Sequence, residues 1–144
     1  MELRTILYAE DNPLDVELTM EALKENKVLN PIITVGDGEE ALAYLSCEGV
    51  YKGRKPVNPG MILLDLKMPI MDGLEFLAIV KKDNNFKRIP VIMLTSSREE
   101  IDLIKTYNLG VNAYIVKPLD FTSLVEVVKQ IGSFWAISNE LPLE

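Results

Sequence analysis

Apolar residues along the chain form five short runs, and each run is followed by a segment in which apolar positions recur at helical spacing. The most continuous run is Met61-Ile62-Leu63-Leu64. An uninterrupted run of this length is typical of a strand buried on both faces, as in a parallel sheet. The pattern predicts strands at residues 3–9, 32–35, 61–64, 91–94 and 113–116.

Helix-start signals follow these runs directly, as capping residues or as capping boxes. They are Asn12-Pro13, the turn Gly36-Asp37-Gly38-Glu39-Glu40 with its acidic helix start, Asp72 with Glu75, Ser97 with Glu100, and Asp120. The first helix is expected to reach about Lys27, and Gly110 to stop the fourth. Helical spacing marks the first helix at Leu14, Leu18 and Ala22 and the fourth at Ile101 and Ile104. The side chains expected to face the core from the other helices are Ala41, Leu42, Leu45, Phe76, Leu77, Val80, Phe121, Leu124, Val125, Val128 and Ile131.

Five strand–helix units in succession predict an α/β fold, a doubly wound (βα)5 three-layer sandwich. Its five-stranded sheet should be parallel with strand order 2-1-3-4-5, as in flavodoxin-like folds. We expect a single domain over residues 1–144, with a core at about 3–131 and a C-terminal extension at 132–144. The switch point of this order lies between the first and third strands, so Glu10, Asp11 and Asp65 should meet in one crevice.

Composition narrows the classes of protein. The net charge is −7 and no basic block appears, which argues against binding nucleic acid. No apolar run is long enough to span a membrane, and the N-terminus lacks the pattern of a signal peptide, so we expect a cytoplasmic protein. Cys47 is the only cysteine and histidine is absent, which removes disulfides, cysteine metal clusters and the commonest general base.

Polar side chains end four of the five expected strands, and together they suggest phosphoryl transfer. Close carboxylates repel one another unless a cation lies among them, and hard oxygen ligands suit Mg²⁺. A carboxylate nucleophile, a metal and hydrogen-bond donors are what a transferring phosphoryl group needs. Each residue alone has an ordinary structural explanation, but their joint occurrence does not. The residues are Glu10-Asp11, Asp65, Thr95 and Lys117.

Two further motifs accompany these strand ends, LLDLKMPIMDG at 63–73 and Tyr114-Ile115-Val116-Lys117-Pro118. Together they resemble the receiver domain of two-component response regulators over about the whole chain. The resemblance implies that Asp65 accepts a phosphoryl group from a phosphohistidine of a sensor histidine kinase. It also implies a phosphoacceptor signalling protein rather than a turnover enzyme. Phosphorylation would change the surface formed by the fourth helix, fifth strand and fifth helix, and a downstream protein would bind the changed surface.

The resemblance also assigns the remaining roles. Glu10, Asp11 and Asp65 would hold Mg²⁺, with Mn²⁺ as a substitute, and the backbone carbonyl of Lys67 would be a further ligand. Thr95 matches the switch hydroxyl, Lys117 the phosphate-pairing lysine, and Tyr114 the aromatic residue that turns inward on activation. The alternative for Tyr114 is an ordinary strand aromatic with a solvated hydroxyl. The Lys117–Pro118 peptide bond matches one that is cis in the family.

The C-terminal segment indicates a partner surface. Val127, Phe134 and Ile137 fall off the inward stripe of the last helix, and Trp135 adds a further apolar group. Apolar residues on two faces favour a homodimer, since exposed apolar patches mark interaction sites; the alternative is that the helix end folds back on its own domain. The 47–60 loop, Phe134-Trp135 and the ending 139–142 resemble small single-domain regulators of bacterial phytochrome kinases. Such a chain leaves no room for an output domain.

Three other readings share parts of this pattern. A flavodoxin-like FMN binder would need a phosphate-binding first loop, which Glu10 and Asp11 would repel. A haloacid-dehalogenase-type phosphatase needs a second acid two residues after the nucleophile, where this chain has Lys67. The third is a phosphorylation-independent protein-binding module on the same fold, against which the intact set of Asp65, Thr95 and Lys117 argues.

Overall fold

The computed structural model describes the backbone of residues 3–139 and the side chains of residues 3–131. Five parallel strands form one sheet in the order β2-β1-β3-β4-β5, which confirms the predicted topology. The strands are β1 (Ile6–Ala9), β2 (Ile32–Val35), β3 (Met61–Asp65), β4 (Val91–Thr95) and β5 (Ala113–Val116).

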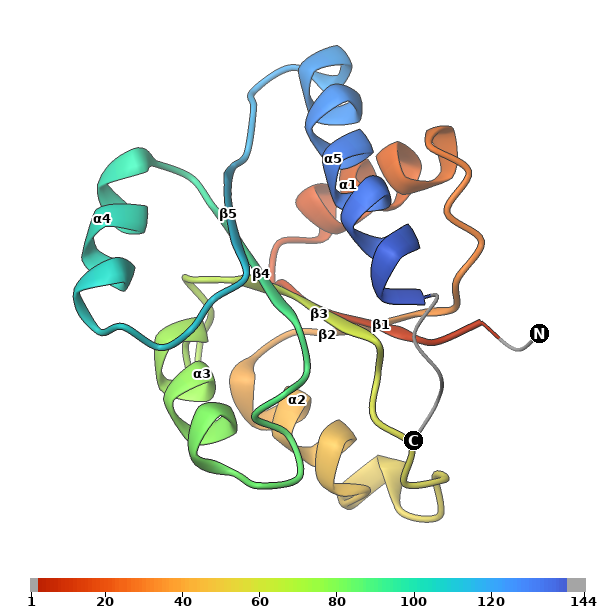
Figure 1. The fold of residues 1–144 in the computed structure, drawn as a ribbon, viewed down its shortest axis with the longest axis vertical. Helices are drawn as coiled ribbons and strands as arrows, with labels where there is room; N and C mark the ends of the chain where they lie inside the picture. The colour runs from red at the N-terminus through yellow and green to blue at the C-terminus, as the bar shows by residue number, and fades with distance from the viewer. Residues whose placement is uncertain (1–2, 140–144) are drawn as a thin grey trace.

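Helices cover both faces of the sheet, so the molecule has three layers (Figure 1). The packing pairs α1 with α5 on one face, while α2, α3 and α4 lie on the other. The helices are α1 (Pro13–Glu25), α2 (Gly38–Ser46), α3 (Gly73–Lys82), α4 (Arg98–Thr106) and α5 (Phe121–Asn139), with a 3-10 turn η1 (Gly49–Tyr51) after α2.

Alternate residues of the strands supply two separate cores. Leu7, Ile62 and Met93 face α2, α3 and α4, whereas their chain neighbours Tyr8 and Leu63 face α1 and α5. Successive side chains of a strand point to opposite faces, so a strand buried on both sides must be apolar throughout. This explains the continuous apolar run from which β3 was predicted.

The predicted caps begin their helices. The Asn12 side chain accepts hydrogen bonds from two backbone amides of the first turn of α1. Asp37, Asp72, Ser97 and Asp120 each accept one from the residue three positions on. Each cap satisfies an amide that the first helical turn would otherwise leave unpaired.

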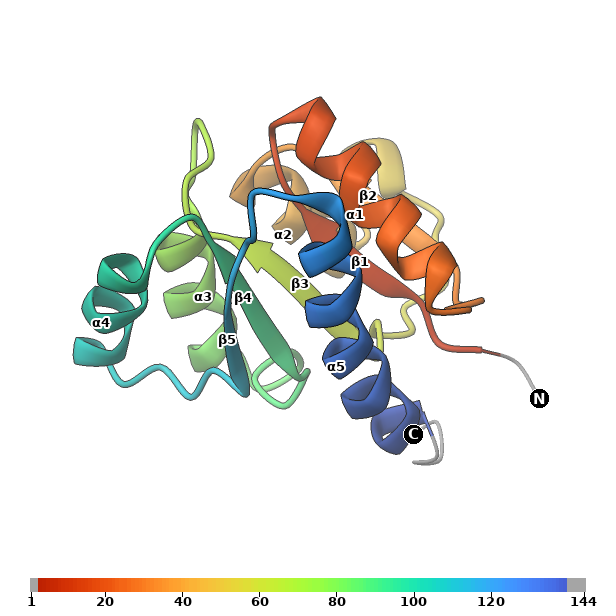
Figure 2. The ribbon, with the colours of Figure 1, turned by 90° about the horizontal axis from the view of Figure 1, so that it is seen from above.

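Several sequence expectations are wrong in detail. Phe121, which was expected to face the core, is 41% exposed, because it is the first residue of α5, and this helix begins beyond the carboxyl ends of the strands (Figure 2). The fourth helix ends at Thr106, before Asn108 takes a positive φ of 49°, rather than at Gly110. The bond between Lys117 and Pro118 is trans, the more stable form for a residue before proline.

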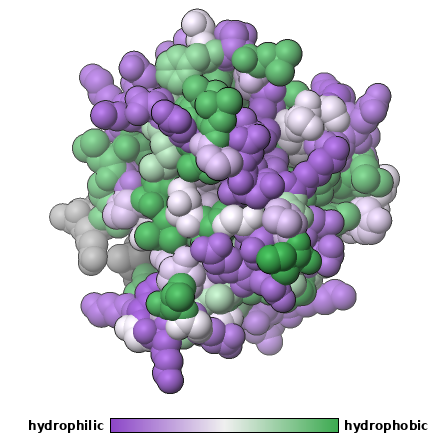
Figure 3. Space-filling view, turned by 180° about the vertical axis from the view of Figure 1, so that it is seen from behind, coloured by the Kyte–Doolittle hydropathy of each residue, from purple (hydrophilic) through white to green (hydrophobic). Residues whose placement is uncertain are grey.

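No helix in the described part of the chain is long and apolar enough to cross a membrane. On the face shown in Figure 3, hydrophobic residues occur in small groups separated by hydrophilic ones. Phe134, Trp135 and Ile137, on which the predicted dimer surface depends, lie outside the residues whose side chains the structure describes.

Candidate functional site

The carboxyl ends of the strands lie at one edge of the sheet, where the turns into α1, α3 and α5 emerge (Figure 2). Glu10 and Asp11 follow β1, and Asp65 ends the neighbouring β3. One carboxylate oxygen of each of the three lies within 4.8 Å of the others. We refer to Glu10, Asp11 and Asp65 as the acidic crevice. The prediction that these three side chains meet is confirmed.

The Lys117 ammonium lies within the same cluster and joins it from β5's side of the sheet. Its Nζ is 2.9 Å from Glu10 Oε1 and 3.3 Å from Asp65 Oδ1. The backbone amide of Lys117 donates to the Thr95 carbonyl oxygen at 2.7 Å, which fixes Lys117, just beyond the end of β5, against the last residue of β4. Three predicted site residues therefore share one network of ion pairs.

Asp15 belongs to this network, and sequence reasoning missed it. Its Oδ2 lies 3.1 Å from Lys117 Nζ. The residue sits in the first turn of α1, where a carboxylate is an ordinary helix-start feature. The helix start predicted at Pro13 puts Asp15 in the first turn after Glu10 and Asp11, and this nearness to the crevice could have identified it from the sequence.

Burial changes the acidity of the cluster. It raises the pKa of the Glu10 carboxyl to about 7, with the Asp65 charge adding to the rise and the hydrogen bond from Lys117 opposing it. Burial likewise raises the pKa of Asp65 against the opposing Lys117 charge. Burial alone would lower the pKa of Lys117, but its Glu10 hydrogen bond and the Asp65 charge outweigh this effect and the net shift is upward.

The donor set fits a divalent cation. All three crevice side chains offer only hard oxygen ligands, which Mg²⁺ and Mn²⁺ accept. Glu10 and Asp65 are only 4% and 7% exposed, while Asp11 is exposed and leaves the crevice open to solvent. Lys117 supplies one positive charge to several carboxylates, so the cluster retains an excess of negative charge that a bound cation would offset.

Two glycines hold the loop that follows Asp65. A Cβ at Gly73 would collide with the Asp65 carbonyl oxygen, so α3 can begin against the end of β3 only with glycine there. A Cβ at Gly38 would lie 2.8 Å from the Met71 carbonyl oxygen, to which the Gly38 amide donates at 2.8 Å. These close backbone approaches fix the position of the loop, and thereby of Lys67.

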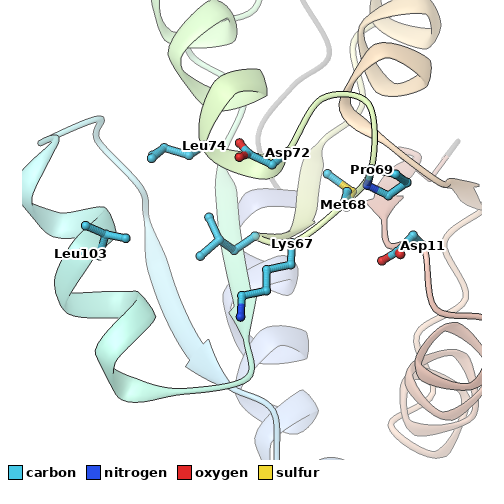
Figure 4. Close-up of a pocket in the computed structure, with 8 residues that line it drawn as sticks. Asp11, Lys67, Met68, Pro69, Asp72, Leu74 and Leu103 are labelled. Atoms are coloured by element: carbon cyan, nitrogen blue, oxygen red, sulfur yellow. The ribbon is translucent and has the colours of Figure 1, made fainter.

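Lys67 lines a cavity of about 510 Å³ beside the crevice, together with Asp11, Met68, Pro69 and Leu103 (Figure 4). Its side chain is 79% exposed and its Nζ pairs with Glu100 Oε1 of α4 at 3.1 Å. No hydrogen bond between described residues uses the Lys67 backbone carbonyl oxygen.

Thr95 and Tyr114 lie further from the carboxylates. Thr95 is fully buried at the end of β4, and its hydroxyl donates to the Ser97 carbonyl oxygen at 3.0 Å. Tyr114 is half-buried on β5, with Lys105 Nζ 5.3 Å from its ring centroid. The structure therefore gathers Glu10, Asp11, Asp65 and Lys117, and leaves these two residues with other partners.

Comparisons with known proteins agree with this fold and site. The family model described as the response regulator receiver domain matches residues 6–129. The chain therefore belongs to the response regulator receiver family, the signalling proteins of two-component systems. The family resemblance drawn from the strand-end residues is confirmed.

Similar proteins include regulators of phytochromes. The response regulator Rcp1 of Synechocystis sp. is 40% identical over 139 residues, which are 96% of this chain and 93% of that protein. The structure of the phosphorylated cyanobacterial phytochrome response regulator RcpA has a TM-score of 0.84 and 43% identity, covering 97% of this chain and 99% of that one. The Mn²⁺-bound form of Rcp1 has a TM-score of 0.82 and 38% identity, covering 98% and 99%. The narrower resemblance to phytochrome regulators is confirmed as well.

Proposed function

We propose that Asp65 is the phosphoacceptor of this receiver and that a sensor histidine kinase, of the phytochrome type, is the donor. The observation that carries the proposal is the convergence of Glu10, Asp11, Asp65 and Lys117 at the carboxyl edge of the sheet. These 144 residues contain no histidine, so the phosphohistidine must lie outside them.

In this proposal the acidic crevice and the Lys67 backbone carbonyl hold Mg²⁺, or Mn²⁺ in its place. The hydrogen bonding supports the role of Lys67, because its carbonyl oxygen is left unused by the described residues. A bound divalent cation supplies positive charge that stabilises the transferring phosphoryl group. The Mn²⁺-bound form of Rcp1 lends further support.

The transfer step uses the Asp65 carboxylate as the nucleophile. One of its oxygens forms a bond to phosphorus as the bond between phosphorus and the donor's imidazole nitrogen breaks, and the imidazole keeps the electron pair. The Lys117 ammonium lies close enough to pair with the new phosphoryl oxygens once it releases Asp65 Oδ1. We expect this self-phosphorylation and a slow hydrolysis of the aspartyl phosphate, without turnover of another substrate.

The switch follows from a change of partners. The Thr95 hydroxyl donates to the Ser97 carbonyl oxygen, and a phosphoryl group on Asp65 would offer it a charged acceptor instead. Its movement would free space for Tyr114, at present covered by Lys105. The surface of α4, β5 and α5 would then change shape for a downstream protein. Exposed Leu103, Tyr107 and Phe121 on this surface suit such a contact.

We further propose a cytoplasmic protein that dimerises through the region of its last helix, with residues 3–131 as the receiver core and 132–144 as the extension. The apolar sequence of the helix end supports the dimer. Gel filtration tests it: a Phe134→Ala/Trp135→Ala variant should elute as a monomer where the wild type elutes as a dimer. Elution of the wild type as a monomer, with or without phosphorylation, would refute the dimer.

Intact mass tests the phosphoacceptor. Incubation with Mg²⁺ and phosphoramidate should add one phosphoryl group to the wild type, and none to Asp65→Asn or to protein kept in a chelator. A gain that persists in Asp65→Asn would place the acceptor elsewhere. If Mg²⁺ binds but neither phosphoramidate nor a phytochrome-type kinase adds mass, the phosphorylation-independent binding module replaces this proposal.

A further inference from the structure

Four cations cluster at the edge of the sheet opposite the acidic crevice. Lys81 and Lys82 end α3, and Lys87 and Arg88 follow in the connection to β4. We refer to Lys81, Lys82, Lys87 and Arg88 as the basic edge. They line one widely open cavity of about 590 Å³ together with Asn108, Leu109 and Gly110 of the α4–β5 connection. Figure 2 shows both connections at the edge away from the turn that follows β3.

The charges of the basic edge are unpaired within the described part of the chain. The described ion pairs involve none of the four cations. Lys81 Nζ donates to the Lys87 carbonyl oxygen at 3.3 Å, and Lys87 Nζ donates to Asn84 Oδ1 at 3.1 Å, so both partners are neutral. No carboxylate lines the cavity. Lys81 is half-buried, and burial lowers its pKa, as expected for an ammonium without a counter-charge.

Helix electrostatics account for only half of this cluster. Cations in the last turn of a helix are stabilised by the helix dipole, which explains Lys81 and Lys82. Lys87 and Arg88 lie beyond α3, where the dipole gives no such benefit. Their concentration is also unusual in a chain with a net charge of −7, because the remaining residues together carry a net negative charge.

The open shape of the basic edge favours an extended ligand over a small molecule. Small molecules are bound mainly in concave pockets that enclose most of their surface. Lys82, Lys87 and Arg88 are instead exposed, so they offer charge over an open surface with the half-buried Leu109 beside them. A nucleic acid would extend past four cations onto the acidic remainder of the protein. A short acidic segment would not.

We propose that the basic edge docks a short segment rich in Asp and Glu on a partner protein. Complementary charge of this kind guides association and selects the partner. The site is independent of the acidic crevice, since it lies at the other end of the strands. It therefore gives the receiver a second contact surface whose occupation does not depend on Asp65.

The test uses a rhodamine-labelled peptide of about ten glutamates, read by fluorescence anisotropy at low salt, where surface charges are least screened. The wild type should bind the peptide, and Lys82→Gln/Arg88→Gln should raise the Kd about tenfold, since both side chains are exposed and charge complementarity is the source of affinity. A matched control, Lys52→Gln/Lys55→Gln, removes the same charge from exposed positions elsewhere and should leave the Kd unchanged. Asp65→Asn should also bind as the wild type does.

Three results would overturn the proposal. One is an absence of peptide binding at low salt, and another is an equal loss of affinity in both double variants, which would indicate only nonspecific attraction. The third is selective binding of a different anion at the basic edge. Inorganic triphosphate bound in preference to the peptide would indicate a small-molecule site, and oligothymidylate bound in preference to it would indicate a nucleic-acid surface.

Discussion

At the carboxyl edge of the sheet, Glu10 and Asp65 are buried around the Lys117 ammonium, whereas at the opposite edge Lys82 and Arg88 lie exposed and form no ion pair among the described residues. The first edge concentrates unlike charges in a poorly solvated crevice. The second presents like charges to water. A buried ion pair is costly to break because the remaining charge stays desolvated, while an exposed charge contributes little to folding. The first edge is therefore tied to stability, and the second is available for binding.

The largest difference between the edges should appear on removal of one cation from each. Lys117→Met leaves Glu10 and Asp65 buried without their counter-charge and should lower the free energy of unfolding by about 3 kcal/mol. Lys82→Met at the basic edge should change it by less than about 0.5 kcal/mol. Urea unfolding at neutral pH without metal measures both. Equal losses of unfolding free energy in the two variants would show that the two edges do not differ in their contribution to stability.

The backbone packing beneath the crevice should be nearly as sensitive. Gly73→Ala places a methyl group against the Asp65 carbonyl oxygen and should cost about 2–3 kcal/mol, because backbone must move on both sides of the contact. Gly36→Ala is the matched control, since its Cβ would approach only the end of the Glu40 side chain, at 3.7 Å. Thermal unfolding of the two variants compares them. An unchanged unfolding temperature in Gly73→Ala would show that the loop after Asp65 can shift freely.

Metal binding should depend on pH through Glu10. Its pKa is raised to about 7, and a protonated carboxyl is a poor ligand, so Mg²⁺ should bind about tenfold more weakly at pH ~6 than at pH ~8. In metal-free protein, the Glu10 carboxyl of the folded state keeps its proton up to about pH 7, whereas that of the unfolded state loses it near the ordinary pKa of 4.5. The free energy of unfolding should therefore fall as the pH rises from 4.5 to about 7.

Calorimetric titration with Mg²⁺ at the two pH values measures this dependence. Glu10→Gln removes the titrating group, and its weaker Mg²⁺ affinity should vary less with pH. An identical pH dependence in Glu10→Gln would assign the effect to another group.

Asp15 should give the smallest effect. Its side chain is 36% exposed, so its ion pair with Lys117 is partly screened by solvent, and Asp15→Asn should lower the free energy of unfolding by about 0.5 kcal/mol. Glu17→Gln, an exposed change on the same helix, serves as the control. A loss as large as that of Lys117→Met would mean that Asp15, rather than Glu10, is the principal partner of Lys117.

The sequence predicted the parts of the molecule that local rules govern. Strand positions followed from continuous apolar runs, helix starts from caps such as Asp72, and the meeting of Glu10 with Asp65 from the strand order. Asp15 was missed because its partner Lys117 lies 102 residues away and only the packed fold shows the contact. Phe121 has helical spacing with the core residues, but spacing does not show where the sheet ends.

The basic edge escaped prediction for a related reason. Lys81-Lys82 and Lys87-Arg88 are separated by four residues that include Asp83, so they do not form a continuous basic run. The overall charge of −7 also conceals a local excess of the opposite sign. Charge summed along a chain does not report charge gathered on one edge.

The division of the sheet into two cores also affects how such a protein can evolve. Tyr8 and Leu63 serve the α1–α5 layer, while Leu7 and Ile62, one position away, serve the opposite layer. Substitutions can therefore accumulate in one layer without repacking the other. The residues around α5 can change in evolution while those on the α4 side, including Thr95 and Tyr114, are retained. One small domain thus holds two independently adjustable modules within a single fold.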